Sequence, residues 1–190
     1  QVVHFDDPVG RSQKAWVMGC NSNLPSTVRV LWAKSVPSDF HARFSAVSRH
    51  YRYVISNSAI QSPHHAGLVS HCRKPLDAQA MHDASQALLG EHDFSAFRAA
   101  QCQASHPRRE ILDISVKRVA DFVVLDVEAN AFLYHMVRNL VGSLQMVGLG
   151  LRPETWIEEL LAGKDRTMGG DTASASGLYL QSLTYPKHLQ

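Results

Sequence analysis

The chain has 190 residues (21.1 kDa), a length that suits one complete domain plus part of another. Hydrophobic residues make up 45% of it and charged residues 19%, which is typical of a globular protein with a core. The net charge of +2 excludes a polycation, and no apolar run approaches the roughly 20 residues that cross a bilayer. The cysteines, odd in number and without a CxxC pair, favour free thiols in a reducing cytoplasm over a disulfide framework, and no signal peptide is recognisable.

The predicted elements begin with a short strand at residues 2–5, a helix at 12–20 and a strand at 28–33. Residues 49–55 alternate as a strand, with Arg49, Tyr51, Tyr53 and Ile55 on one face. Residues 77–89 read as an amphipathic helix that stops at Gly90. A turn between 119 and 122 joins strands at 111–119 and 122–129 into a hairpin. A long buried helix at 131–149, a shorter helix at 154–162 and a strand at 178–185 follow. This order predicts an α+β fold, sandwich-like, in which helices pack on a mixed, mostly antiparallel sheet.

The charge is unevenly distributed along the chain. Residues 40–76 carry five Arg or Lys and no Asp or Glu, and arginine outnumbers lysine 13 to 6 overall. Aromatic rings alternate with these arginines at 40–53, a pattern that suits RNA because rings stack on bases and guanidinium groups hold phosphates. A half-buried sheet with core tyrosines and solvated arginines is the alternative interpretation.

Two further segments could carry chemistry. Residues 92–109 form a polar loop in which Gln101 and Gln103 lie near three arginines, so the loop could contact RNA or could be a surface loop anchored by two phenylalanines. Arg138 lies within an apolar helix in a stretch, 129–153, that contains no Asp or Glu. A buried guanidinium needs a carboxylate or several acceptors, so a partner from elsewhere is predicted unless the side chain reaches water. No histidine or cysteine spacing predicts a metal site.

At these segments the chain resembles the tRNA pseudouridine synthase I (TruA) family. The matching segments are FHARFSA at 40–46, RHYRYVI at 49–55, GEHDFSAFRAAQCQ at 90–103, ANAFLYHMVRNLVGSLQMVG at 129–148 and GLYLQSLTYP at 177–186. The opening QVVHF and the GCNSNLP turn at 19–25 match as well, so the resemblance covers essentially the whole chain.

The resemblance implies a pseudouridine synthase fold and a homodimeric, cytoplasmic enzyme that isomerises uridine at positions 38 to 40 in the anticodon arm of tRNA, without a cofactor or a membrane. It implies that Tyr51 and Arg138 are the active-site tyrosine and arginine. It also implies that the tRNA is contacted by Arg11, by Phe40, His41, Ala42, Arg43 and Phe44, and by Gln101, Cys102, Gln103, Ala104 and Ser105.

One part of the family pattern is not found in residues 1–190. The family's nucleophilic aspartate lies in a GRTDAGVHA-like motif just before the QVVHF segment, and no GRTD occurs in the sequence. The resemblance therefore predicts that residues 1–39 are the remnant of an N-terminal α/β domain and 40–190 the C-terminal α/β domain. It also predicts that the chain is inactive alone and that the absent aspartate is the partner of Arg138. A non-catalytic RNA-binding domain and a purely structural domain are the alternatives.

Overall fold

The computed structural model describes residues 1–189 as two compact units. One unit contains residues 1–46 with the end of the chain from Tyr185, and the other contains residues 47–184. The first unit therefore combines residues from both ends of the chain. The assignment of 1–39 and 40–190 to two domains stays a prediction.

The first unit contains one α-helix, α1 (Gln13–Asn23), and a 3₁₀ turn, η5 (Lys187–Leu189). The Ser12 hydroxyl accepts a hydrogen bond from the Ala15 N–H and so caps the first turn of α1. The Asp7 carboxylate accepts three backbone N–H bonds and one from the Trp16 indole, which fixes the loop before the helix. The predicted helix at 12–20 is thus confirmed and runs three residues further.

The strands predicted at 2–5 and 28–33 are wrong, because residues 1–46 contain no strand. Both segments have strand-like composition, but neither finds a neighbouring strand among the described residues. Instead, the Asn21 side chain bonds both the N–H and the carbonyl of Val30. Several apolar side chains of these segments are exposed, among them Val3, Phe5, Leu31 and Trp32.

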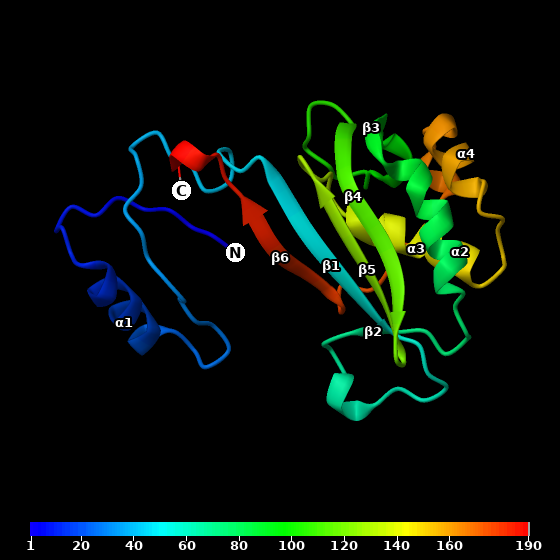
Figure 1. Cartoon of the computed structure of the whole chain (residues 1–190), viewed down its shortest axis with the longest axis horizontal. Coiled ribbons are helices and arrows are strands. Elements are labelled where there is room, and N and C mark those ends of the chain that lie inside the picture. Colours follow the sequence, from blue (N-terminus) through cyan, green and yellow to red (C-terminus); the bar gives the residue numbers. More distant parts are fainter. Residues whose placement is uncertain (190) are drawn as a thin grey trace. The chain divides into compact units, whose positions relative to one another are not determined.

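The second unit is built on a six-stranded sheet (Figure 1). Its strands pair in the order β2-β1-β5-β4-β3, and β6 pairs with β1. All pairs are antiparallel except β1 with β2. The strands are β1 (Ser48–Ser56), β2 (Ser70–His71), β3 (Gly90–Asp93), β4 (Arg108–Val119), β5 (Phe122–Ala129) and β6 (Leu178–Thr184).

The three α-helices of this unit lie on one side of the sheet (Figure 1). They are α2 (Ala78–Ser85), α3 (Met136–Gly148) and α4 (Trp156–Gly163), and 3₁₀ turns occur at η1 (Pro63–His65), η2 (Gln86–Leu88), η3 (Ser95–Phe97) and η4 (Arg166–Met168). The core lies between helices and sheet, where Tyr53 and Ile55 of β1 pack with Leu125 of β5 and with Leu140 and Leu144 of α3. The predicted α+β fold with a mostly antiparallel sheet is confirmed.

The predicted two-residue alternation of β1 is also confirmed. Tyr53 and Ile55 are fully buried, whereas His50 and Arg52 point to the opposite face. There they share the carboxylate of Asp126 on β5, at 3.1 Å from the His50 Nε2 and 2.8 Å from the Arg52 Nε. Burial by itself would raise the pKa of Asp126, but the bonds from Arg52 and His50 outweigh it, and the pKa lies below its ordinary value.

The hairpin between β4 and β5 was predicted with its turn at the observed residues, although β4 begins three residues before the predicted strand at 111–119, and Ala120 takes the positive φ of 50° in the turn. Two short strands, β2 and β3, were not predicted. For β3 the reason is that Gly90–Asp93 is polar and has the composition of a loop when its neighbour β4 is not considered.

In the part of the chain that the structure describes, no helix is both long and apolar enough to cross a membrane.

Candidate active site

Arg138 lies in the first turn of α3 rather than in the middle of the predicted helix. The helix was predicted from residue 131 but begins at Met136, because its N-cap residue, His135, has a left-handed backbone with φ of 59°. The preceding apolar residues form a turn instead. The half-buried Arg138 side chain therefore leaves the helix at its N-terminal end.

Two acceptors fix the guanidinium of Arg138. Its Nε donates to the carbonyl oxygen of Ala173 at 2.6 Å, and its Nη1 lies 3.3 Å from the Nε2 of His135. The backbone adds a third contact, since the Ala173 N–H donates to the Arg138 carbonyl at 3.1 Å. The orientation of the guanidinium plane is thus set from two sides.

The charge of Arg138 has no counter-ion in residues 1–189. No carboxylate lies within 4.0 Å of its guanidinium, and its Nη2 has no hydrogen-bond partner there. The first turn of α3 contains no acidic residue either, so the positive end of the helix dipole adds to the charge. This end of α3 favours an anion.

Residues 169–174, here called the clamp segment, connect Arg138 to the sheet. The segment gives Arg138 the Ala173 carbonyl and gives the buried Tyr53 hydroxyl the Ser174 carbonyl at 2.8 Å. Its Thr172 hydroxyl donates to the buried Asn139 at 2.6 Å, and its Gly170 N–H donates to the Ser143 hydroxyl. Helix α3 and the clamp segment therefore form one polar network.

The clamp segment lies directly on Gly142. The backbone of Asp171 occupies the space beside Gly142, so no room for another group remains there. A Cβ added at Gly142 would overlap the Asp171 carbonyl oxygen, and one added at Gly170 would lie 2.6 Å from the Gly142 carbonyl oxygen. Close backbone approach explains both glycines.

Gly142→Ala is expected to destabilise the chain by about 1–3 kcal/mol, because the clamp segment must move off α3. For a chain of this size the thermal midpoint should fall by roughly 2–12 °C. Gly163→Ala is the matched control, since Gly163 ends α4 and has no atom within 4 Å of an added Cβ. Melting curves by circular dichroism test this, and an unchanged or higher midpoint for Gly142→Ala would contradict the close contact.

Tyr51 lies on the helix-covered face of β1, two residues before Tyr53. Its half-buried ring packs edge-on against Phe132, with ring centroids 5.1 Å apart. Burial raises the pKa of Tyr51 above its ordinary value, opposed only in part by the cation of Arg49. The phenol is therefore neutral at pH 7. Its hydroxyl has no hydrogen-bond partner among residues 1–189, unlike the hydroxyl of Tyr53.

The same segment before α3 approaches both proposed active-site side chains. Phe132 contacts Tyr51, and His135, three residues later, contacts Arg138. The second unit therefore brings Tyr51 and Arg138 to one face of one sheet, as their proposed common role requires.

Residues 101–105 form an irregular loop beside this segment. The Arg98 Nη2 donates to the carbonyls of Cys102 and Ala104, at 2.9 and 2.7 Å, and shapes the loop from inside. Gln101, Gln103 and Ser105 are exposed. The two anchoring phenylalanines are confirmed, since Phe94 and Phe97 are fully buried; contact of the loop with RNA stays a prediction.

The other predicted contact residues lie in the first unit. The Arg11 guanidinium lies 5.3 Å from the ring centre of Trp16. In the turn at 40–44, the His41 ring packs at a tilt between the rings of His4 and Phe44, each with its centroid 4.3 Å away. Three further contacts are made in this turn. The Arg43 guanidinium lies 5.5 Å from the Phe44 ring centre, Phe40 packs on Tyr185, and the Tyr185 hydroxyl donates to the Ala42 carbonyl. Phe44 remains 73% exposed, so an aromatic face is available.

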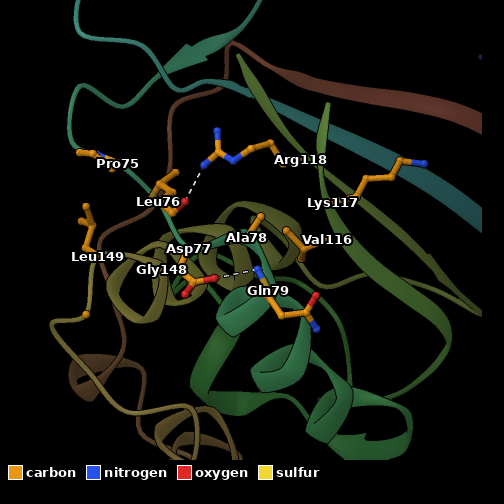
Figure 2. A pocket seen from close by; sticks show the side chains of 11 residues that line it. Pro75, Leu76, Asp77, Ala78, Gln79, Val116, Lys117, Arg118, Gly148 and Leu149 are labelled. Atoms are coloured by element: carbon orange, nitrogen blue, oxygen red, sulfur yellow. Dashed lines mark hydrogen bonds between the residues drawn. The ribbon is translucent and has the colours of Figure 1, made fainter. Parts of the chain in front are cut away.

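A cavity of about 800 Å³ lies elsewhere, at the start of α2 (Figure 2). Figure 2 shows that two of its polar side chains, Asp77 and Arg118, form hydrogen bonds with other lining residues. Asp77 caps α2 through the N–H groups of Gln79 and Ala80, and Arg118 donates to the Leu76 carbonyl. None of the predicted site residues lines it, so the cavity is not assigned to the active site.

The sequence did not point to His135, Asn139 or the clamp segment. The Gly169–Gly170 pair was a usable signal, because adjacent glycines opposite Gly142 and Ser143 allow close backbone packing. The acceptors that the clamp segment supplies to Arg138 and Tyr53 are backbone carbonyls, and their positions cannot be predicted from the types of side chain in the sequence.

Comparison with known proteins gives a consistent result. A family model described as tRNA pseudouridine synthase matches residues 84–186. The chain is 54% identical over 188 residues to the tRNA pseudouridine synthase A of Idiomarina loihiensis, covering 99% of this chain and 72% of that protein. It is 57% identical over 187 residues to the Xylella fastidiosa protein of that name (98% and 73% covered) and 53% identical over 188 residues to the one from Klebsiella pneumoniae (99% and 70%).

Proposed function

Because this chain belongs to the tRNA pseudouridine synthase family, we propose that Tyr51 and Arg138 are its active-site residues. The enzymes of this family isomerise uridine to pseudouridine in tRNA. The observation that carries the assignment is the guanidinium of Arg138, held in place at the start of α3 and without a counter-ion in residues 1–189.

The reaction exchanges one glycosidic bond for another. The bond between uracil N1 and the ribose C1′ breaks, and a bond between uracil C5 and C1′ forms. The C5 hydrogen leaves as a proton and N1 takes one up, so the substrate and product have the same atoms and no electrons are exchanged. A base must leave its stack to react in this way, as for other enzymes that modify bases.

Arg138 is proposed to pair with the nucleophilic carboxylate, which an aspartate segment outside residues 1–190 would supply. A guanidinium within hydrogen-bond distance lowers the pKa of a carboxylate and keeps it ionised. The Nη2 group is available for this contact, because the Nε and Nη1 groups already bond Ala173 and His135. The fixed plane of the guanidinium would then orient the carboxylate as well as charge it.

Tyr51 is proposed to contact the target uracil. Its ring can pack against a flipped-out base, and its neutral hydroxyl can donate a hydrogen bond or exchange a proton at C5 or N1. A hydroxyl without a partner in residues 1–189, beside a packed ring, suits contact with a substrate better than a purely structural role.

The finer assignments rest on the family resemblance. The tRNA is proposed to react at positions 38 to 40 of its anticodon arm and to contact Arg11 and residues 40–44 and 101–105. Exposed Phe44 and the polar loop suit such contacts, because rings stack on bases and amides bond base edges. A homodimeric state and a cytoplasmic location are proposed on the same basis.

The position of modification can be mapped directly. Unmodified tRNA is incubated with the chain joined to an upstream segment that carries a GRTD-type motif, hereafter the extended chain. Carbodiimide adducts of pseudouridine, read as primer-extension stops, should appear only at positions 38 to 40. Stops elsewhere in the tRNA would contradict the proposed specificity, and binding without any stop would favour the non-catalytic RNA-binding alternative.

A further inference from the structure

Tyr134 is an exposed aromatic residue that lies directly beside the proposed active site. It is 49% exposed, although it is flanked by the buried Leu133 and by His135. Its ring stacks on the imidazole of His135, with centroids 4.0 Å apart and planes 23° apart. No second ring packs on Tyr134 among the described residues, so the stack has an open end.

The backbone of Tyr134 is fixed from both sides. Its N–H donates to the Cys102 sulfur at 3.3 Å, and its carbonyl accepts from the Ala99 N–H at 3.2 Å. The next residue, His135, has the left-handed φ of 59° that begins α3. These constraints hold the stack in place without help from the Tyr134 hydroxyl, for which the described residues offer no partner.

The stack connects two parts of the proposed site. His135 contacts the Arg138 guanidinium on one side, and Tyr134 is bonded to the 99–102 loop on the other. Burial alone would raise the pKa of the Cys102 thiol, but the Tyr134 and Ala104 N–H groups and the Arg98 guanidinium lower it below its ordinary value. Two guanidinium groups, those of Arg98 and Arg138, thus lie in the surroundings of Tyr134.

We propose that Tyr134 is a stacking platform for one base of the RNA strand next to the target uridine. This inference rests on the proposed function, because it places the target uridine at Tyr51 and Arg138. A base offers a flat face to the Tyr134 ring and hydrogen-bonding edges to the amide groups of exposed Gln101 and Gln103.

The role can be tested by binding, separately from catalysis. An anticodon stem-loop RNA and the 190-residue chain are used, with Tyr134→Phe and Tyr134→Leu as variants. Tyr134→Phe should bind within twofold of the unsubstituted chain, because it keeps the ring. Tyr134→Leu should raise the Kd by roughly 5- to 150-fold, the usual effect of losing one base stack. The slope of log Kd against log salt should not change, because no charge is removed.

A set of RNAs with one abasic nucleotide identifies the stacked base. At one position near the target, removal of the base should weaken binding to the unsubstituted chain as much as Tyr134→Leu does. The abasic nucleotide and Tyr134→Leu combined should weaken binding no more than either change alone. Losses that add at every position, or a Tyr134→Leu variant that binds within twofold of the unsubstituted chain, would overturn the inference. If the unsubstituted chain fails to bind the RNA, the proposed function is contradicted as well.

Discussion

Replacing Arg138 with lysine in the extended chain should lower kcat for pseudouridine formation by about 10²–10³-fold, the usual effect of removing one preorganised donor. Lysine keeps the positive charge but has no planar fork. The three donors of an ammonium group radiate from one nitrogen, so they cannot reproduce the planar arrangement that bonds the Ala173 carbonyl and the His135 imidazole and orients a carboxylate. The KM for tRNA should change far less, because the contact is made to reacting groups.

Arg52→Lys is the matched control for this experiment. Arg52 lies on β1 on the opposite face of the sheet and pairs with Asp126, where a lysine can still form an ion pair. Its kcat should stay within about twofold, since it lies away from the proposed reacting groups. Initial rates across tRNA concentrations separate kcat from KM. A kcat for Arg138→Lys close to that of the unsubstituted enzyme would exclude a catalytic role for the guanidinium geometry.

The two tyrosines of β1 should respond in opposite ways to loss of their hydroxyl groups. Tyr51→Phe should lower kcat by about 10²–10⁴-fold, as expected for a group that transfers or positions a proton. Its melting midpoint should change little, because the ring still packs on Phe132 and its hydroxyl bonds nothing in residues 1–189. The hydroxyl is neutral at pH 7, since burial raises its pKa.

Tyr53→Phe is the comparison. It removes the 2.8 Å bond to the Ser174 carbonyl in the core, so the free energy of unfolding should fall by about 0.5–1.5 kcal/mol. The kcat of Tyr53→Phe should fall less than that of Tyr51→Phe, because the substitution affects Arg138 only indirectly, through the clamp segment. Melting curves and kcat measured for both variants decide the assignment. Loss of stability with retained activity in Tyr51→Phe would mean that Tyr51 is a core residue only.

Much of the second unit could be predicted from local patterns. The alternation at 49–55 identified β1 and its buried face, and the β-rich runs on either side of residues 120 and 121 identified the β4–β5 hairpin. Periodicity also located α2, α3 and α4. It failed at the start of α3, because the left-handed backbone of His135 is a single-residue event that no pattern marks.

The first unit shows where such patterns mislead. Residues 2–5 and 28–33 have the composition of strands, but a strand also needs a neighbour to accept its backbone hydrogen bonds. Within residues 1–46 no such neighbour exists, and a side chain, Asn21, takes up the bonds of Val30 instead. Local sequence carries no information about which partner is present.

The site was predictable only in part. An arginine in an acid-free stretch of sequence pointed to Arg138, and the family resemblance pointed to Tyr51. The groups that hold Arg138 could not be predicted, because the Ala173 carbonyl is a backbone atom 35 residues away. Exposed Tyr134 was expected on the helix, yet it lies before the helix, stacked on His135.

The most direct test of the account is release of tritium from tRNA that carries [5-³H]uridine, because the reaction removes the C5 hydrogen. The extended chain should release tritium, whereas residues 1–190 alone should release none, as should the extended chain with the motif aspartate replaced by asparagine. Tritium release by residues 1–190 alone, or by the extended chain without that aspartate, would contradict the proposed pairing of Arg138 with a nucleophilic carboxylate. No release by the extended chain, despite tRNA binding, would contradict the account as a whole.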